Sequence, residues 1–365
     1  DALGHDRQWQ GWFLDFPTMW RDCPSYVYLF PFTYGQAGVA MFFVVSGFCI
    51  HLSYAKARTA GWRGFFVRRF FRIYPPYLVA LILFMIWSLP VFVSTPRPLQ
   101  WVTHLLTVQN LNSVTFYGVV PAFWSIALEL QLYLLYPVLI WGVARFGWVR
   151  ALIGLAVLEF GLRLANMIYM MHRGVDLPAW IIGLPFAYWF SWSLGAYVAQ
   201  GYLTGQRNFL GTWRWGLVAA ALLVSVVFWP AREMVLFSAS AVATAIALDR
   251  LVAGRWQLPG GRLGDWGWRH LCFLGGISYS FYLFHQPLIH ALGWNRLSNH
   301  PRVAAWLAHV THLDWNFQST DHTLQFFLGV ASYVLILPLS WLAFRVLEQP
   351  SIAAGKWVLG KLSPR

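Results

Sequence analysis

Two arginines stand three residues apart where an apolar run begins, and their spacing suits phosphate binding. Arg69 and Arg72 follow Arg68 directly before that run. Side chains at positions i and i+3 of a helix lie on one side, so the two guanidinium groups could hold one phosphate or pyrophosphate together. Acyl-coenzyme A carries such groups on the cytoplasmic side. Arginines just inside a membrane can equally be topogenic or bind anionic lipid headgroups, and this alternative stays open.

Glu129 and His285 are ionisable residues within apolar runs, and they are candidates for acid–base chemistry. A charged side chain in the middle of a bilayer costs about 3 kcal/mol unless it is paired or wet. Ser125 precedes Glu129 by four residues and shares its helix face, next to Trp124. A carboxylate and an imidazole together can deprotonate a hydroxyl, or the carboxylate can hold the imidazole in its reactive tautomer. The alternatives are a buried pair without function, or two residues that never meet.

The remaining ionisable and reactive side chains favour structural roles. Glu159 and Arg163 form an i,i+4 pair on one expected helix, and mutual neutralisation is enough to explain them. Cys23, Cys49 and Cys272 are scattered, with neither a disulfide framework nor the spacing of a metal site. We therefore expect no metal.

The composition is that of a membrane protein. Hydrophobic residues make up 58% of the 365 residues and charged residues only 11%, which would leave a soluble protein without a polar surface. The net charge of +13 could indicate nucleic-acid binding, but the basic residues lie in short loops between apolar runs and not on one face or tail. The composition therefore predicts a bilayer as the partner and argues against nucleic acid.

Nine apolar runs are long enough to cross a bilayer, and they predict an all-α polytopic helix bundle. The runs cover about 36–54, 73–93, 121–143, 151–171, 179–200, 215–229, 234–250, 271–292 and 323–345. Pro75 and Pro76 begin the second run, which suits the entry to a helix or a kink.

The basic residues predict how these helices cross the membrane. Alternate loops differ in Lys and Arg content, with seventeen on one side and seven on the other, although the longest loops, 94–120 and 293–322, belong to the poorer side. The side richer in Lys and Arg is expected to be cytoplasmic, and the C-terminus lies on that side. We expect the membrane to be the inner (plasma) membrane of the cell. Nine spans then place Asp1 outside, so we expect a further membrane segment upstream of it.

Several sequence blocks together resemble the acyltransferase 3 family of integral membrane acyltransferases, which O-acetylate surface polysaccharides, lipopolysaccharide and related small molecules. The blocks are GVAMFFVVSGF at 38–48, FVRRFFRIYP at 66–75, FWSIALE at 123–129, LYLLYP at 132–137, FSWSLG at 190–195, LGGISYSFYLFH at 274–285 and FRVLEQP at 344–350. They occur in the family's order over residues 36–350. The resemblance predicts an acyltransferase domain over 36–350, preceded by an external segment at 1–35 and followed by a cytoplasmic tail at 351–365.

The resemblance also implies roles for particular residues. Arg69 and Arg72 correspond to the family's Arg-x-x-Arg pair and, with Arg68, would hold an acyl-coenzyme A donor. Trp124, Ser125 and Glu129 correspond to its acidic helix motif.

One element of the family is absent from this sequence. The family's first helix carries an Arg and, eleven residues later, the His regarded as the catalytic base. His5 is the only histidine near Asp1, and it lies among polar residues without an upstream Arg. We therefore expect a tenth helix, with that His, before Asp1.

These expectations combine into one reaction. An acyl group, in the first instance acetyl, would pass from acetyl-coenzyme A or another acyl-coenzyme A to a hydroxyl of a glycan or glycolipid acceptor, such as O-antigen or exopolysaccharide. The upstream His would take the hydroxyl proton while Glu129 orients or charges it. His285, Tyr282 and Ser278 would line the acceptor path. The alternative is a transporter or flippase for a lipid-linked glycan, which is weakened by the lack of an inverted repeat.

Overall fold

The computed structural model is helical throughout the residues that it describes. These residues are 35–56, 61–87, 97–206, 217–218, 220–221, 224, 229–255, 261–291 and 322–362, and no strand occurs among them. The chain divides into two units: Gln36–Gly276 with Val346–Arg365, and Asp1–Gly35 with Ile277–Arg345. We call the first of these the larger unit. The expected all-α polytopic membrane fold is confirmed.

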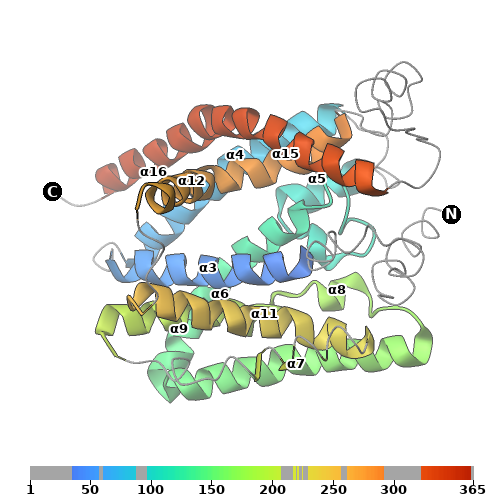
Figure 1. Cartoon of the computed structure of the whole chain (residues 1–365), viewed down its shortest axis with the longest axis vertical. Coiled ribbons are helices and arrows are strands. Elements are labelled where there is room, and N and C mark those ends of the chain that lie inside the picture. Colours follow the sequence, from blue (N-terminus) through green and yellow to red (C-terminus); the bar gives the residue numbers. More distant parts are fainter. Residues whose placement is uncertain are drawn as a thin grey trace. The chain divides into compact units, whose positions relative to one another are not determined.

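The larger unit is built mainly from long helices (Figure 1). Its helices are α3 (Gly35–Lys56), α4 (Gly61–Trp87), α5 (Arg97–Leu105), η4 (Gln109–Leu111), α6 (Phe123–Phe146), α7 (Trp148–Arg173), α8 (Ala179–Ile182), η5 (Pro185–Ala187), α9 (Trp189–Thr204), α11 (Trp229–Val252) and α16 (Gln349–Leu362). The second unit contains α15 (His322–Ala343). Helix α12 (Gly261–Ala291) begins in the larger unit and ends in the second, and the π-helical turn η7 (Phe344–Glu348) leads from α15 to α16.

Five helices within the described ranges are long and apolar enough to cross a membrane. They are Ala37–Lys56, Gly61–Ile86, Phe123–Phe146, Trp148–Arg173 and Val235–Val252. The expected span 179–200 is interrupted, because the short helices α8 and η5 precede α9 and Pro185 begins a new turn. Most of the expected span 215–229 lies outside the described residues. The number nine therefore stays a prediction.

Helix α4 starts twelve residues before the expected second span, so its basic residues and both prolines lie inside it. Pro75 has no N–H to donate to the carbonyl of Phe71, four residues earlier. The structure supplies another donor, because the hydroxyl of Ser351 on α16 donates to Phe71 O. Gly355 of α16 also packs against the Phe71 side chain, where a Cβ would come within 2.8 Å. A prolyl segment can thus stay helical when a neighbouring helix satisfies its freed carbonyl.

Two glycines bring α3 and α9 into backbone contact. A Cβ on Gly47 would lie 2.0 Å from Trp192 O, and a Cβ on Gly195 would lie 1.8 Å from Val44 O. No side chain fits at either position. Small residues at helix crossings allow this close packing in membranes, where lipid is as apolar as the protein and shape must hold the helices together.

Replacing Gly195 by Ala should separate α3 from α9. The clash is with a backbone carbonyl, which cannot rotate away, so we expect a loss of about 1–3 kcal/mol in the free energy of unfolding. Gly161→Ala on α7 is the matched control, because a Cβ there meets nothing within 4 Å. Thermal unfolding of the purified protein in detergent compares them. Equal midpoints for the two variants would contradict the assigned crossing.

His104 in α5 should make the segment between α4 and α6 sensitive to acid. Burial lowers the pKa of His104 from 6.5 to about 4, although its Nδ1–H donates to Gln100 O at 2.8 Å. Because the unfolded segment binds the proton more readily, its stability is complete above pH 6.5 and declines as the pH falls towards 4. Hydrogen exchange of residues 97–120 should therefore accelerate between pH 7 and pH 5, after correction for intrinsic rates. A His104→Gln variant should show no such pH step, and its persistence would contradict the assignment.

Candidate active site

Glu129 is the centre of a buried hydrogen-bonded cluster at the junction of three helices. It lies on α6, six residues after Phe123, and only 6% of its surface is exposed. Its Oε1 accepts a hydrogen bond of 2.8 Å from Ser46 Oγ on α3 and another from the hydroxyl of Tyr133, one turn along α6. Trp192 on α9 donates its Nε1–H to Ser46 Oγ at 3.3 Å. We call Glu129, Ser46, Tyr133 and Trp192 the carboxylate cluster.

The two oxygens of Glu129 differ in their surroundings. Both hydrogen bonds reach Oε1, and no described residue donates to Oε2. The carboxylate is therefore fixed through one oxygen while the other is available for a further donor, such as an imidazole N–H or a substrate hydroxyl.

Arg69 approaches this cluster from α4. Its guanidinium carbon lies 6.0 Å from the centre of the Tyr133 ring and 5.9 Å from that of Phe65. The residue is only 9% exposed, and its Nε is buried without a hydrogen-bond partner in the described part of the chain. A buried cation with unused donors can bind an anion strongly.

The other two predicted donor-binding arginines differ from Arg69. Arg68 is partly buried, and its Nε and Nη2 likewise have no hydrogen-bond partner among the described residues. Arg72 is exposed within the larger unit. The Arg-x-x-Arg pair thus places one guanidinium inside the helix packing and leaves the other at its surface.

Trp124 and Ser125 lie close to Glu129 in sequence but make other contacts. Ser125 is buried, and its hydroxyl donates to Ala122 O at 3.2 Å in the first turn of α6. The Trp124 ring stacks on Phe116, with ring centres 5.6 Å apart and planes inclined by 23°. These contacts give both residues a place at the start of α6, and their catalytic roles stay predictions.

His285, Tyr282 and Ser278 all lie on α12 in the second unit. The His285 ring is parallel to Phe281 at 5.7 Å, and its Nδ1–H donates to Tyr282 O at 2.8 Å. That bond leaves Nε2 as the basic nitrogen. Because Glu129 belongs to the larger unit and each unit is described by itself, a pairing of Glu129 with His285 stays a prediction. His5 lies outside the described residues.

A second polar layer, which the sequence reasoning did not identify, contains His51. His51 on α3 is almost fully buried; its Nε2 lies 2.8 Å from Gln200 Oε1, and its Nδ1 lies 2.9 Å from the hydroxyl of Tyr136. Because the amide oxygen can only accept, Nε2 carries the proton and Nδ1 accepts from Tyr136. The sequence did contain a signal for this site, since His51 is an ionisable residue within the first expected span. The layer lies five residues beyond Ser46 on α3, about 7 Å along the helix.

Glu159 and Arg163 form the expected pair on α7, with Arg163 Nε 3.7 Å from Glu159 Oε1. Glu159 also accepts from Ser191 N at 3.0 Å and Ser191 Oγ at 2.5 Å, and from Ser238 Oγ at 3.3 Å. Arg163 donates to Ala187 O at 2.9 Å. Partners on α9 and α11 thus bind both oxygens of Glu159, and η5 accepts from Arg163, while Arg163 Nε makes the ion pair alone; these contacts agree with a structural role.

Among the described residues, no group of three His, Cys, Asp or Glu side chains is placed to hold a metal ion. Buried guanidinium donors without a hydrogen-bond partner in the described ranges, such as those of Arg68 and Arg69, could hold an anionic ligand.

Comparisons with known proteins identify the family of the chain. The chain is 23% identical over 300 residues to Nodulation protein 10 of Rhizobium leguminosarum bv. viciae, covering 73% of this chain and 76% of that protein. No solved structure matches. Residues 5–345, nearly the whole chain, match the family model described as an acyltransferase domain. The chain therefore belongs to the acyltransferase 3 family and is a membrane acyltransferase.

Proposed function

We propose that this acyltransferase moves an acetyl group from acetyl-coenzyme A to a hydroxyl of a carbohydrate or glycolipid acceptor. The observation that carries the proposal is the contact of Arg69 with Tyr133, whose hydroxyl donates to Glu129. It brings a cation with unused donors close to a buried carboxylate. Binding of the anionic acyl-coenzyme A requires such a cation, and activation of the acceptor hydroxyl requires such a carboxylate.

The depth of these residues suits a reaction inside the membrane. Arg69 lies eight residues after Gly61, about 12 Å from the end of α4 that we predict to be cytoplasmic. Glu129 lies about 9 Å from the opposite, outer end of α6. When these distances are counted from the two sides of a hydrocarbon core of about 30 Å, the two residues lie about 9 Å apart in depth. Donor and acceptor could therefore meet near the carboxylate cluster, with Arg68 and Arg72 assisting Arg69 in holding the donor.

The reaction requires one proton to move twice. A base takes the proton of the acceptor hydroxyl while its oxygen attacks the thioester carbonyl. The C–O bond forms, the C–S bond breaks, and the proton passes to the departing thiolate to give coenzyme A. A histidine would serve as this base, oriented by Glu129 through Oε2. His285, Tyr282 and Ser278 would line the path of the acceptor.

Transfer of label from acetyl-coenzyme A into base-labile glycan ester tests this function, in membranes containing the full-length protein. Glu129→Gln should abolish transfer because the amide cannot hold a cationic imidazole. Arg69→Lys should reduce transfer about tenfold or more, because an ammonium group cannot replace a bidentate guanidinium. Arg145→Lys, at the exposed end of α6, is the control and should retain activity. Full activity of Arg69→Lys would remove the donor assignment.

The same assay separates the enzyme from the alternative function. If none of the membranes transfers label while the glycan still crosses the bilayer, the protein acts as a transporter or uses another donor.

Ser46 should act as a positioning residue for Glu129. Ser46→Ala removes one of the two hydrogen bonds to Oε1 and leaves Trp192 Nε1 without its acceptor. We expect kcat to fall about tenfold while the KM for the acyl donor stays the same, since Arg69 is untouched. Ser46→Thr keeps the hydroxyl and should recover most of the activity. A variant pair with equal kcat values would show that the hydroxyl does not position Glu129.

A further inference from the structure

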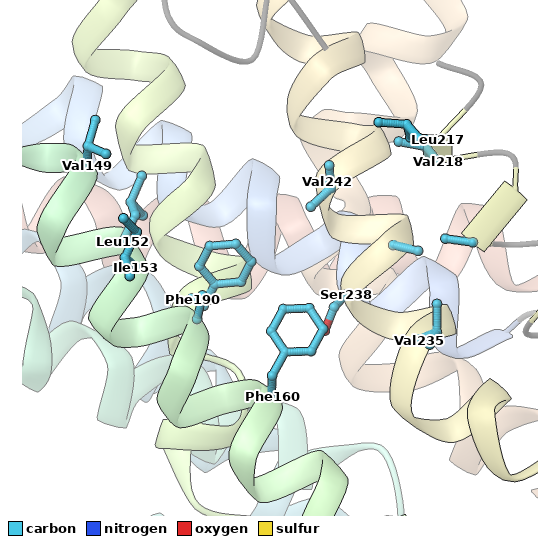
Figure 2. Close-up of a pocket in the computed structure, with 13 residues that line it drawn as sticks. Val149, Leu152, Ile153, Phe160, Phe190, Leu217, Val218, Val235, Ser238 and Val242 are labelled. Atoms are coloured by element: carbon cyan, nitrogen blue, oxygen red, sulfur yellow. The ribbon is translucent and has the colours of Figure 1, made fainter. Parts of the chain in front are cut away.

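A cavity of about 640 Å³ lies between α7, α9 and α11 in the larger unit, with Leu217, Val218 and Ala221 completing its lining. None of its lining residues belongs to the carboxylate cluster. Figure 2 shows Leu152 and Ile153 of α7 on one side and Val235 and Val242 of α11 on the other. Phe160 and Phe190 also line it. Its volume falls within the range of ordinary ligand sites.

The chemistry of the lining selects an apolar ligand. The one lining side chain with a polar atom, Ser238, donates its hydroxyl hydrogen to Glu159 Oε1 at 3.3 Å. A polar ligand would lose its hydration here without gaining matching partners, which costs several kcal/mol. A hydrocarbon chain has no such cost.

The length and setting of the cavity suit one chain of a membrane lipid. Its lining on α7 runs from Val149 to Phe160, eleven residues or about 16 Å. This is about half of the 30 Å hydrocarbon core, the depth of one leaflet. Helices α7 and α11 both contain candidate membrane spans, and α7 buries only 17% of its apolar window, the lowest share of the five. Most of the surface of α7 is therefore left to the surrounding lipid.

One end of the cavity is basic. Arg150 follows Val149 directly, is exposed, and shares a helix face with the lining residue Ile153. Arg145 is exposed at the end of α6 that leads into α7. A Lys or Arg at a membrane surface attracts an anionic headgroup, whereas a neutral headgroup gains nothing from it.

We propose that this cavity binds one acyl chain of an anionic phospholipid, with the phosphate of that lipid next to Arg150. The site does not take part in the proposed acyl transfer, so its test and the transferase assay can fail independently.

Photo-crosslinking with phosphatidylglycerol that carries a diazirine in its acyl chain tests the chain site, using the full-length protein in nanodiscs. Peptides of α7 and α11 should be labelled, and an excess of unlabelled phosphatidylglycerol should compete. Ala156→Phe fills the cavity and should reduce this labelling about fivefold or more. Val157→Phe places the same ring one residue later, at a position 69% exposed outside the lining, and should leave labelling unchanged.

Equal labelling of these two variants would overturn the chain site. Should Ala156→Phe fail to fold, competition on the unaltered protein decides, because labelling that excess lipid does not reduce is nonspecific contact.

The headgroup is tested with phosphatidylcholine carrying the same acyl chain. Labelling should be about fivefold weaker than with phosphatidylglycerol, and Arg150→Gln should remove most of that difference. Equal labelling by the two lipids, or a preference unchanged in Arg150→Gln, would overturn the assignment of an anionic lipid.

Discussion

The hydrogen bonds to Glu129 are the constraint on which the rest of the larger unit depends. An intramembrane carboxylate needs partners, and Ser46 and Tyr133 supply them from α3 and from α6 itself. Ser46 is in turn held by Trp192 on α9, which requires the backbones of α3 and α9 to touch. Only glycine fits at that contact, as the positions of Gly47 and Gly195 show. The close helix crossing and the orientation of the carboxylate are therefore parts of one arrangement.

A comparison of the two buried glutamates separates function from structure. Both oxygens of Glu159 accept hydrogen bonds, and Arg163 lies in ion-pair distance of one of them. Glu129 uses only one oxygen in the described part of the chain. Its nearby cation, Arg69, contacts the Tyr133 ring and keeps Nε unused. The two carboxylates therefore differ in how fully they are used: both oxygens of Glu159 are bound within the helix packing, whereas Oε2 of Glu129 is left for a further donor.

Residue type and local spacing were sufficient to find some of these features and not others. Glu129 stands out in the sequence because charge is rare in apolar segments, and Arg69 because of its i,i+3 spacing from Arg72. The pair of Glu159 with Arg163 follows from i,i+4 spacing. Ser46 and Trp192 do not stand out, since serine and tryptophan are common in membrane helices and their contacts join residues 83 and 146 positions apart. Such contacts come from the packing of whole helices, which one sequence does not specify. The burial of His51 could have been anticipated from its place in the first expected span.

The C-terminal helix α16 supports α4 although it lies outside the family match. That match ends at residue 345, whereas α16 begins at Gln349 and packs on α4, the helix that carries Arg69. Because Pro75 leaves the carbonyl of Phe71 without its helical donor, Ser351 is needed to satisfy it within the helix packing. Phe71 lies two residues from Arg69, so the helical course of α4 at the arginines depends on this contact. We infer that α16 is part of the acyltransferase fold, with a structural role at the position where the donor is proposed to bind.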